Sequence, residues 1–199
     1  MFAIQVISSI ITSYLLGSIP TAYVVCKRRG IDIFSIGTGN PGAGNTFRKV
    51  GKREGFFVFL VDTAKGYLSL VIVLSIFQLD NEWLIIAGTF SIIGHLYSVF
   101  TKFRGGGGLA TLIGVSLYLL PKAILIGAVP TILLLLLIRD AVWSSIVGFV
   151  VAAITDLVFF KYPQIRIVST MLIGVILLIR MLVMEYFKNK RGVITNETG

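Results

Sequence analysis

The sequence predicts an all-α membrane protein with seven transmembrane helices, its N-terminus outside the membrane and its C-terminus in the cytoplasm. Of its 199 residues, 56% are hydrophobic and only 14% are charged, whereas soluble domains are about 25% charged. The apolar residues form stretches that can cross a bilayer, and Lys and Arg gather in alternate connections between them. This composition excludes a disordered chain, and a single cysteine, Cys26, excludes a disulfide-stapled one.

Seven apolar stretches, separated by charges, glycine and proline, define the predicted spans. They cover residues 2–26, 55–78, 83–100, 108–120, 123–138, 141–160 and 167–187. The first lacks the basic start and the cleavage site of a secretory signal, so we expect it to remain as a helix. The fourth and fifth are short and meet at Pro121, so one kinked span in their place is the alternative, with six spans in all.

The positive charges in the loops favour seven spans over six. With seven spans, one side carries only Lys122, Lys161 and Arg166, beside an acidic turn at residues 80–82. Cytoplasmic loops are enriched in Lys and Arg, so the richer side is cytoplasmic, and a count of six would weaken this bias by moving Arg139 and the basic C-terminal residues outside. The cytoplasmic set is Lys27, Arg28, Arg29, Arg48, Lys49, Lys52, Arg53, Lys102, Arg104, Arg139, Lys188, Lys190 and Arg191.

We expect residues 1–191 to form a single polytopic membrane domain, followed by a short polar cytoplasmic tail at residues 192–199. The polar segments 27–54 and 102–108 both fall on the cytoplasmic side, while the outer loops are brief. The formal net charge of +9 in a membrane chain points to the cytoplasmic leaflet and to anionic substrates.

The glycine-rich segment at residues 37–48 is the first candidate site. It reads Gly-Thr-Gly-Asn-Pro-Gly-Ala-Gly-Asn-Thr-Phe-Arg. Glycines let backbone N–H groups turn inward around an anion, Asn and Thr add neutral donors, and Arg48 can add a forked, charged contact. The segment therefore predicts a phosphate site, with a flexible loop of turn residues as the alternative.

The second candidate combines His95 with the basic glycine loop at residues 102–108. His95 is the only histidine and lies near the inner end of the third span, where it could act as a general base or contact phosphate. Four glycines that open a helix beside Arg104 are typical of an anion site at a helix N-terminus. The alternatives are a structural histidine and a hinge between spans.

Asp62 and Lys65 form the third candidate, inside the second span. Three residues apart on a helix, the two charges share a face and can pair. Ionisable groups at membrane depth normally face a bundle interior or a polar cavity, so a structural ion pair and a substrate contact both remain open. Ser144, Ser145 and Arg180, near the inner ends of later spans, are weaker candidates of the same kind.

These motifs together resemble the bacterial acyl-phosphate:glycerol-3-phosphate acyltransferase family, and the resemblance covers most of the chain. The residues that carry it, with their order and spacing, are Gly17-Ser18, Gly37-x-Gly39-Asn40-Pro41-Gly42-Ala43-x-Asn45-x-x-Arg48, Gly51-Lys52, Asp62-x-x-Lys65-Gly66, Gly94-His95-x-Tyr97 and Phe103-x-Gly105-Gly106-x-Gly108. The family has seven transmembrane helices and an outside N-terminus, in agreement with the count above.

The resemblance implies an enzyme of phospholipid synthesis in the bacterial inner membrane, with its active site facing the cytoplasm. It would transfer an acyl group from acyl phosphate to glycerol 3-phosphate, giving lysophosphatidic acid, without a cofactor or a metal. His95 and Arg104 would be catalytic, His95 orienting the site or assisting proton transfer. The residues implied to bind substrate are Thr38, Gly39, Asn40, Gly42, Asn45, Arg48, Asp62, Lys65, Gly105, Gly106 and Ser145.

The chain departs from the family pattern at several positions. Gly107 stands where the glycine loop usually has a second lysine, and Arg104 replaces its first. Near the C-terminus the family has Arg-His-x-x-Asn, whereas Arg180 here is followed by Met181 and Met184. These losses leave two alternatives open: an acyltransferase with a different acceptor, and a non-catalytic membrane protein that binds lipids or anions.

Overall fold

The computed structural model describes residues 1–80 and 82–197, with side chains as far as Val183. The elements of this part of the chain are all helical. They are α1 (Phe2–Ser18), α2 (Thr21–Arg28), α3 (Ala43–Lys49), α4 (Lys52–Phe77), α5 (Glu82–Leu96), a 3₁₀ turn (Val99–Thr101), α6 (Leu109–Leu119), α7 (Pro121–Ile138), α8 (Ala141–Thr155), a π-helical turn (Asp156–Phe160) and α9 (Gln164–Glu197).

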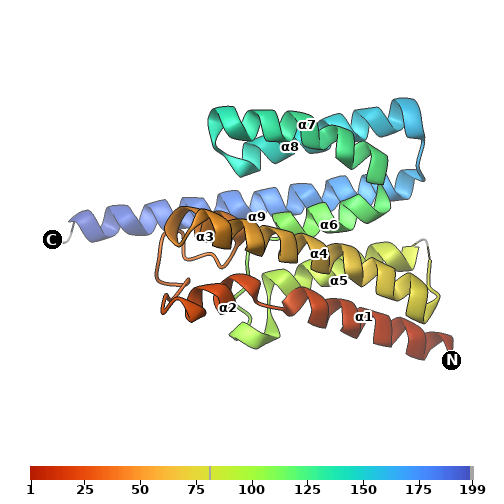
Figure 1. Cartoon of the computed structure of the whole chain (residues 1–199), viewed down its shortest axis with the longest axis horizontal. Helices are drawn as coiled ribbons and strands as arrows, with labels where there is room; N and C mark the ends of the chain where they lie inside the picture. The colour runs from red at the N-terminus through yellow and green to blue at the C-terminus, as the bar shows by residue number, and fades with distance from the viewer. Residues whose placement is uncertain (81, 198–199) are drawn as a thin grey trace.

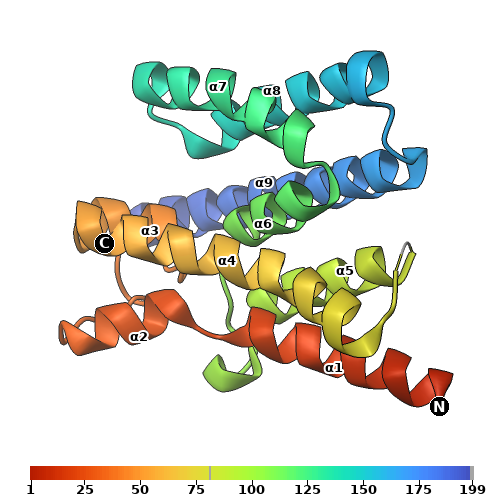
Figure 2. The same ribbon diagram turned by 45° about the vertical axis from the view of Figure 1, so that its right-hand side comes forward.

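The long helices lie side by side along one common direction (Figure 1). α1, α4 and α5 form one side of the bundle, α6 and α9 lie in the middle, and the hairpin of α7 and α8 covers the other side (Figures 1 and 2). α1 begins at one end of the bundle and α9 ends at the other. Many large apolar side chains of α7, α8 and α9 are exposed, as expected for helices that face lipid.

Six helical stretches are long and apolar enough to cross a membrane. They are Phe2–Arg28, Lys52–Phe77, Glu82–Thr101, Pro121–Ile138, Ala141–Phe160 and Gln164–Val183. The fourth and fifth predicted spans are separate helices, and the chain reverses direction between α6 and α7 (Figure 1). However, α6 has only 11 residues, about 16 Å at 1.5 Å per residue, against a hydrocarbon core of about 30 Å.

The first predicted span is broken into α1 and α2 at Ile19 and Pro20. Proline has no N–H and disfavours helical geometry in the residue before it, so the chain bends there. The break frees the Ile19 carbonyl, which accepts a hydrogen bond of 2.9 Å from the Lys65 ammonium. A polar backbone group is therefore presented inside the bundle.

The segment 27–54, which we expected to be a glycine-rich loop, contains the additional helix α3. Its residues 37–42 form turns, and Gly42 stands in an extended conformation just before the helix. α3 then packs closely on the start of α4, where a Cβ at Gly55 would meet the backbone of Phe47. This tertiary contact stabilises a seven-residue helix that local sequence signals do not reveal.

Glycines bring the central helices into close contact. A Cβ at Gly17 of α1 would meet the Ser91 carbonyl of α5, and one at Gly114 of α6 would meet the Thr63 carbonyl of α4. Small residues at such crossings are typical of membrane helices, whose association depends on close packing. The contacts hold the C-terminal ends of α1 and α5 and the middle of α4 around one polar pocket.

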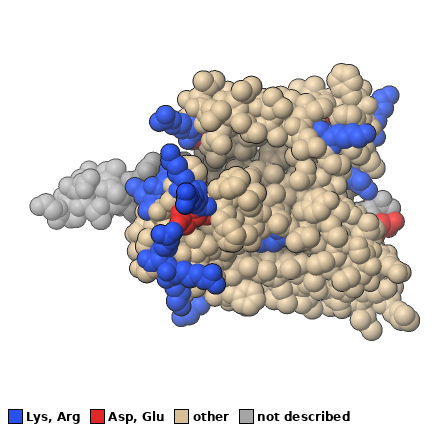
Figure 3. All heavy atoms as spheres, in the orientation of Figure 1, with Lys and Arg blue, Asp and Glu red and all other residues tan. Residues whose placement is uncertain are grey.

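Basic side chains gather at the end of the bundle where α2 and α3 lie, and fewer occupy the opposite end (Figure 3). The basic residues exposed at that end on α2, α3 and the start of α4 are Lys27, Arg28, Arg48, Lys49, Lys52 and Arg53. The charge asymmetry expected from the loops is therefore present in three dimensions.

Candidate active site

Four separate parts of the chain line a polar pocket near the basic end. They are the break between α1 and α2, Pro41 of the first glycine-rich segment, the middle of α4, and the C-terminal end of α5 with the glycine loop that follows it. The lining residues are Ser18, Ile19, Pro20, Thr21, Pro41, Asp62, Lys65, His95, Ser98, Thr101, Arg104, Gly105 and Gly106. The second and third sequence candidates therefore meet in a single site.

Asp62 is the centre of the hydrogen-bond network on the pocket wall. Its Oδ1 accepts from Thr21 Oγ1 at 3.0 Å and pairs with Lys65 Nζ at 2.9 Å. His95 Nδ1 faces the same oxygen at 3.8 Å. All three titratable side chains are buried, with 1%, 4% and 6% of Asp62, Lys65 and His95 exposed. Ionic groups at this depth need such partners, because an isolated charge inside a membrane protein is strongly unfavourable.

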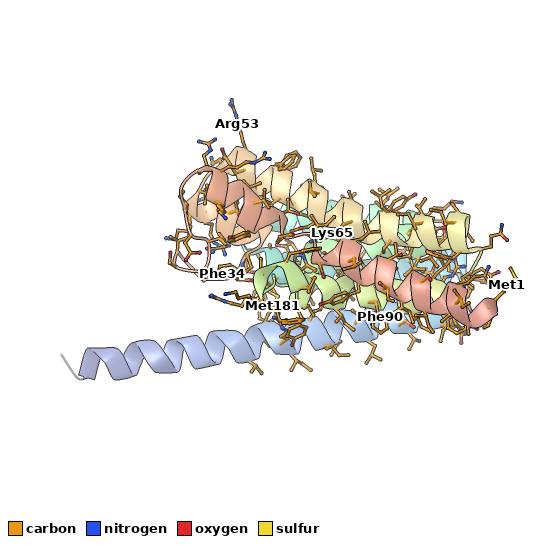
Figure 4. The ribbon with its side chains drawn as sticks, turned by 90° about the horizontal axis from the view of Figure 1, so that it is seen from below. Met1, Phe34, Arg53, Lys65, Phe90 and Met181 are labelled. Atoms are coloured by element: carbon orange, nitrogen blue, oxygen red, sulfur yellow. The ribbon has the colours of Figure 1, made fainter. Side chains whose placement is uncertain are left out.

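Lys65 completes the network by bridging α4 to the broken first helix. Its ammonium contacts both Asp62 and the Ile19 carbonyl, and Figure 4 shows it directed into the space between helices. The two alternatives for the Asp62–Lys65 pair are therefore compatible: the residues form a structural ion pair, and they also line the pocket.

The glycine loop folds back onto the end of α5. Gly105 N–H donates to the Leu96 carbonyl at 3.1 Å, and Gly106 N–H donates to the His95 carbonyl at 2.9 Å. These bonds satisfy carbonyls that the helix end would otherwise leave unpaired. A Cβ at Gly106 would meet His95 Nε2 and, at 2.8 Å, the Pro41 carbonyl. The loop needs glycine for close approach, and these two N–H groups already have partners.

Two arginines flank the glycine loop. Arg104 is exposed, and its guanidinium carbon lies 4.0 Å from the centre of the Phe34 ring. Arg180, from α9, donates to the Gly106 carbonyl at 3.2 Å and lies 5.6 Å from the centre of the Tyr97 ring. Arg104 therefore supplies positive charge at the pocket mouth, whereas Arg180 holds the glycine loop through its hydrogen bond to the Gly106 carbonyl.

Asn45 organises the first glycine-rich segment. Its Oδ1 accepts from Thr38 N–H at 3.2 Å, and its Nδ2 donates to the Ile36 carbonyl at 3.1 Å. Asn40 N–H in turn approaches Thr38 Oγ1 at 3.4 Å. Both polar ends of the Asn45 side chain are therefore used to shape the turn that carries Thr38, Gly39 and Asn40.

The first segment meets the glycine loop at the pocket mouth. A Cβ at Gly107 would lie 3.3 Å from Asn40 Nδ2, and one at Gly42 would lie 4.0 Å from Gly107 N. Pro41 between them lines the pocket itself. The two glycine-rich motifs thus form one mouth, as expected if they bind a common ligand.

Several residues expected to bind substrate are not among the described residues that line this pocket: Thr38, Gly39, Asn40, Gly42 and Asn45, which belong to the segment beside its mouth, and Arg48 and Ser145. Arg48 is exposed on α3, and its guanidinium nitrogens lie 3.7 Å from the position of a Cβ on Gly44 of the same helix. Ser145 Oγ donates to the Ala141 carbonyl of its own helix, α8, at 2.6 Å. α8 belongs to the hairpin on the far side of α9 (Figure 1).

Several contributing residues had no motif to reveal them. Thr21 holds Asp62, Ser98 Oγ donates to the Ser18 carbonyl at 2.6 Å, and Thr101 Oγ1 donates to the Arg104 carbonyl at 2.8 Å. Their only sequence signal is a hydroxyl beside a break in an apolar segment. Phe34 carries no such signal, because its contact with Arg104 joins two different loops.

The departures at Gly107 and Met181 are neighbours in the structure. A Cβ at Gly107 would lie 3.9 Å from Met181 Sδ, and Figure 4 labels Met181 on α9. The side chain of Met184 lies outside the described part of the chain. Gly107 in the glycine loop and Met181 on α9, which both differ from the family pattern, therefore lie next to each other.

Fold and site together define a multi-pass helical membrane protein with a polar, basic pocket near one end of its bundle. The chain belongs to the glycerol-3-phosphate acyltransferase family, because the model of that family matches residues 7–195.

Curated relatives carry the same family name. The chain is 40% identical over 116 residues to the glycerol-3-phosphate acyltransferase of Aquifex aeolicus, a match that covers 58% of this chain and 60% of the relative. It is 45% identical over 151 residues to glycerol-3-phosphate acyltransferase 2 of Bacillus cereus, with 74% of each chain covered. The chain thus spans about three fifths of the Aquifex relative and about three quarters of the Bacillus one.

A solved structure has the same fold. The crystal structure of PlsY, an integral membrane glycerol 3-phosphate acyltransferase, in its glycerol 3-phosphate form matches with a TM-score of 0.79 and 31% sequence identity. The match covers 96% of this chain and 92% of that one. The lysophosphatidic acid form of the same protein matches with a TM-score of 0.77.

Proposed function

We propose that this protein transfers an acyl group from acyl phosphate to the 1-hydroxyl of glycerol 3-phosphate, giving lysophosphatidic acid for phospholipid synthesis. The observation that carries the proposal is the pocket itself, where Arg104, His95 and the Asp62–Lys65 pair meet near the basic end of a membrane bundle. Both substrates bear phosphate and one bears a lipid tail, so a basic pocket at this depth suits them. The family membership supports the same reaction.

The chemistry requires positioning more than activation. Acyl phosphate is a mixed anhydride, so the hydroxyl oxygen attacks the acyl carbon, the bond from that carbon to the phosphate oxygen breaks, and phosphate leaves with its electron pair. Binding both substrates in one pocket supplies proximity, and a cation near the departing phosphate stabilises developing charge. No covalent enzyme intermediate or cofactor is needed.

His95 is placed to receive the hydroxyl proton. Its Nδ1 faces Asp62 Oδ1 at 3.8 Å, which is too far for a direct hydrogen bond. In the proposed reaction the nearby carboxylate charge favours the tautomer that carries the proton on Nδ1 and leaves Nε2 as the acceptor. Nε2 lies against Gly106, whose lack of a side chain leaves room for it. Lys65 and Thr21 hold the Asp62 carboxylate and thereby set the orientation of the imidazole.

In this proposal, the two glycine-rich segments at the pocket mouth bind the phosphate groups of the substrates. Arg104 would provide the charge, and the side chains of Thr38 and Asn40 would provide neutral polar groups. The N–H groups of Thr38, Gly39, Asn40 and Gly42 already donate within the segment, and Asn45 shapes its turn. Gly105, Gly106 and Lys65 line the pocket. We give Arg48 and Ser145 no direct contact, because Arg48 is exposed on α3 and Ser145 lies in α8.

The proposed topology has seven spans, with the N-terminus outside, the C-terminus in the cytoplasm and the pocket facing the cytoplasm of the bacterial inner membrane. α6 would then be a short span, and the glycine loop folded beside it would cross the part of the membrane thickness that α6 does not cover. Buried irregular backbone of this kind is tolerated within membrane proteins. Residues 1–191 would form one membrane domain with the polar tail at 192–199.

The direct test is an assay of the purified protein in detergent with acyl phosphate and glycerol 3-phosphate. We expect stoichiometric release of inorganic phosphate and formation of lysophosphatidic acid, detected by mass spectrometry. Omission of the acceptor controls for hydrolysis of acyl phosphate, and the Arg104→Ala variant controls for contaminating enzymes. Folded protein that forms no lysolipid, beside an active family member, would contradict the proposal.

A different polyol phosphate as acceptor is the second candidate, and the proximity of Gly107 to Met181 favours it. The wall that they form has neither the lysine nor the histidine typical of the family, so it offers fewer donors to an acceptor. A screen of polyol phosphates at equal concentration separates the two candidates. The Gly107→Lys, Met181→His variant, with and without Met184→Asn, should shift preference toward glycerol 3-phosphate if this wall selects the acceptor.

A further inference from the structure

The guanidinium of Arg104 rests on an aromatic ring instead of a carboxylate. Its carbon lies 4.0 Å from the centre of the Phe34 ring. Among the side chains that the structure describes, no Asp or Glu pairs with Arg104, whereas Arg29 at the same end is paired with Glu54. Arg104 therefore keeps its full positive charge while one face is held in place.

The Phe34 ring is itself a fixed platform. Phe34 N–H donates to Asp32 Oδ1 at 3.0 Å, and the preceding residue, Ile33, is completely buried. The Tyr23 ring of α2 lies 6.0 Å away, centre to centre. The Phe34 ring is half-buried between α2 and the glycine loop. It can therefore support the Arg104 guanidinium from a fixed position.

The backbone of Arg104 is fixed as well. Its N–H donates to the Thr101 carbonyl at 3.1 Å, and its carbonyl accepts from Thr101 Oγ1 at 2.8 Å. With the main chain anchored at one end and the guanidinium stacked at the other, the long flexible stem between them has few conformations left. Ordering such a side chain in advance reduces the entropy lost when a ligand binds.

A cation–π contact leaves the hydrogen-bonding groups of arginine free. When a guanidinium stacks on a ring, the ring covers one of its flat faces, and the five N–H donors, which lie in the guanidinium plane, stay directed outward. A carboxylate in the same place would occupy those donors and neutralise the charge. An aromatic ring, unlike a carboxylate, therefore holds the guanidinium in place and leaves its N–H donors available to an anion.

We propose that Phe34 is a positioning residue that holds Arg104 ready to bind the phosphate of a substrate at the pocket mouth. This inference rests on the proposed function, since it assigns Phe34 to the step in which phosphate is bound. The shared chemistry is a phosphate group, which either acyl phosphate or glycerol 3-phosphate supplies.

The test compares Phe34→Leu with Phe34→Trp in the acyltransferase assay. Leucine removes the ring and tryptophan keeps an aromatic face, so only leucine should raise the KM, by about two- to five-fold as expected for an exposed cation–π contact. The KM is measured separately for acyl phosphate and for glycerol 3-phosphate, and the substrate whose KM rises is the one that Arg104 binds. The kcat should change less than the KM.

A double-mutant cycle separates positioning from a general structural role. If Phe34 acts through Arg104, Phe34→Leu should have no further effect on kcat/KM in an Arg104→Ala background. Phe57→Leu, which removes another exposed ring on α4, is the matched control. An unchanged KM in Phe34→Leu, an equal rise in Phe34→Trp, or an undiminished effect in the Arg104→Ala background would overturn the inference.

Failure of the proposed function gives a different result. An inactive wild-type protein contradicts the reaction, and the same variants are then compared for binding of inorganic phosphate by isothermal titration calorimetry. Weaker phosphate binding in Phe34→Leu but not in Phe34→Trp keeps the positioning role for an anion site without acyl transfer. Equal phosphate binding in wild type and both variants removes that role.

Discussion

Asp62 and Lys65 illustrate how one charged pair at membrane depth serves both folding and the site. Each is buried, each pairs with the other at 2.9 Å, and each reaches a different element: Asp62 contacts Thr21 on α2, and Lys65 contacts the carbonyl between α1 and α2. The pair therefore ties α4 to the broken first helix. His95 faces the same carboxylate. A change in the Asp62–Lys65 pair therefore alters the surroundings of His95 in the pocket.

We expect Lys65→Met to destabilise the protein because it leaves the Asp62 carboxylate buried without its cation. Breaking a buried pair in this way costs about 3–5 kcal/mol. Thermal unfolding in detergent, followed by circular dichroism, measures the loss. The double variant Asp62→Asn, Lys65→Met removes both charges and should recover much of the stability, and a single variant as stable as wild type would argue against a buried pair.

Arg104→Ala should reduce activity while leaving the fold intact, since the side chain is exposed and rests against the Phe34 ring. A hydrogen bond to a charged group contributes about 1.5–3 kcal/mol, which corresponds to about a ten- to hundredfold loss in kcat/KM. The assay is run beside a thermal unfolding measurement. Arg53→Ala, exposed at the start of α4 and outside the pocket lining, is the matched control. Full activity in Arg104→Ala would refute the assignment of Arg104 to the site.

At the scale of elements, the glycine loop and the broken first helix together make a pocket out of packed helices. The loop returns along the end of α5 and satisfies two of its carbonyls, while the break at Pro20 opens α1 and α2 toward α4. The pocket is shaped mainly by backbone, because the main chain turns at Pro20 and again in the glycine loop. The site is therefore sensitive to added atoms where the loop lies closest to α5, at Gly105 and Gly106.

The loop glycines should differ in their tolerance of substitution. Gly106→Ala would place a methyl group against His95 Nε2 and the Pro41 carbonyl, and Gly105→Ala would press on the carbonyls of α5. Both variants should lose activity, and the thermal unfolding temperature should fall with it. Gly107→Ala meets only Asn40 Nδ2 at 3.3 Å and the flexible Met181 side chain, so we expect near-normal stability. Equal effects at all three positions would contradict the observed loop geometry.

For the whole molecule, the proposed orientation in the membrane rests on the distribution of charge. The basic residues lie mainly at the end with α2 and α3 (Figure 3), and Arg104 of the pocket lining adds to them. If that end is cytoplasmic, as we propose, the same charge serves two purposes, orientation in the membrane and attraction of anionic substrates.

Variants with one introduced cysteine each test the proposed topology. In intact cells, a membrane-impermeant thiol reagent should label Lys122→Cys after the outer membrane is opened, and should label Lys49→Cys only after the inner membrane is permeabilised. The native Cys26 is completely buried and should give little background. A reporter fused after Gly199 should be cytoplasmic with seven spans and external with six, so an external reporter would exclude the count of seven.

Much of the architecture could be predicted because apolar length and loop charge are local properties. The predicted spans correspond to α1 with α2, and to α4 to α9, and the break between α6 and α7 falls at Pro121 as expected. The helix α3 was not predicted, since packing against Gly55 stabilises it rather than its own seven residues. Within the described part of the chain, six helical stretches are long and apolar enough to span a membrane, and α6 is too short to be counted among them.

The sequence by itself determined that this is a helical membrane protein of one family, with basic glycine-rich segments on one side, because composition, motif spacing and charge can be read along the chain. Only the tertiary structure decided which motif residues share a pocket. It brought Asp62, His95 and Arg104 together, left Arg48 and Ser145 outside, and placed Phe34 against Arg104. The physical reason is that contacts between distant segments depend on helix crossings and on a turn at Pro20, which no local pattern records.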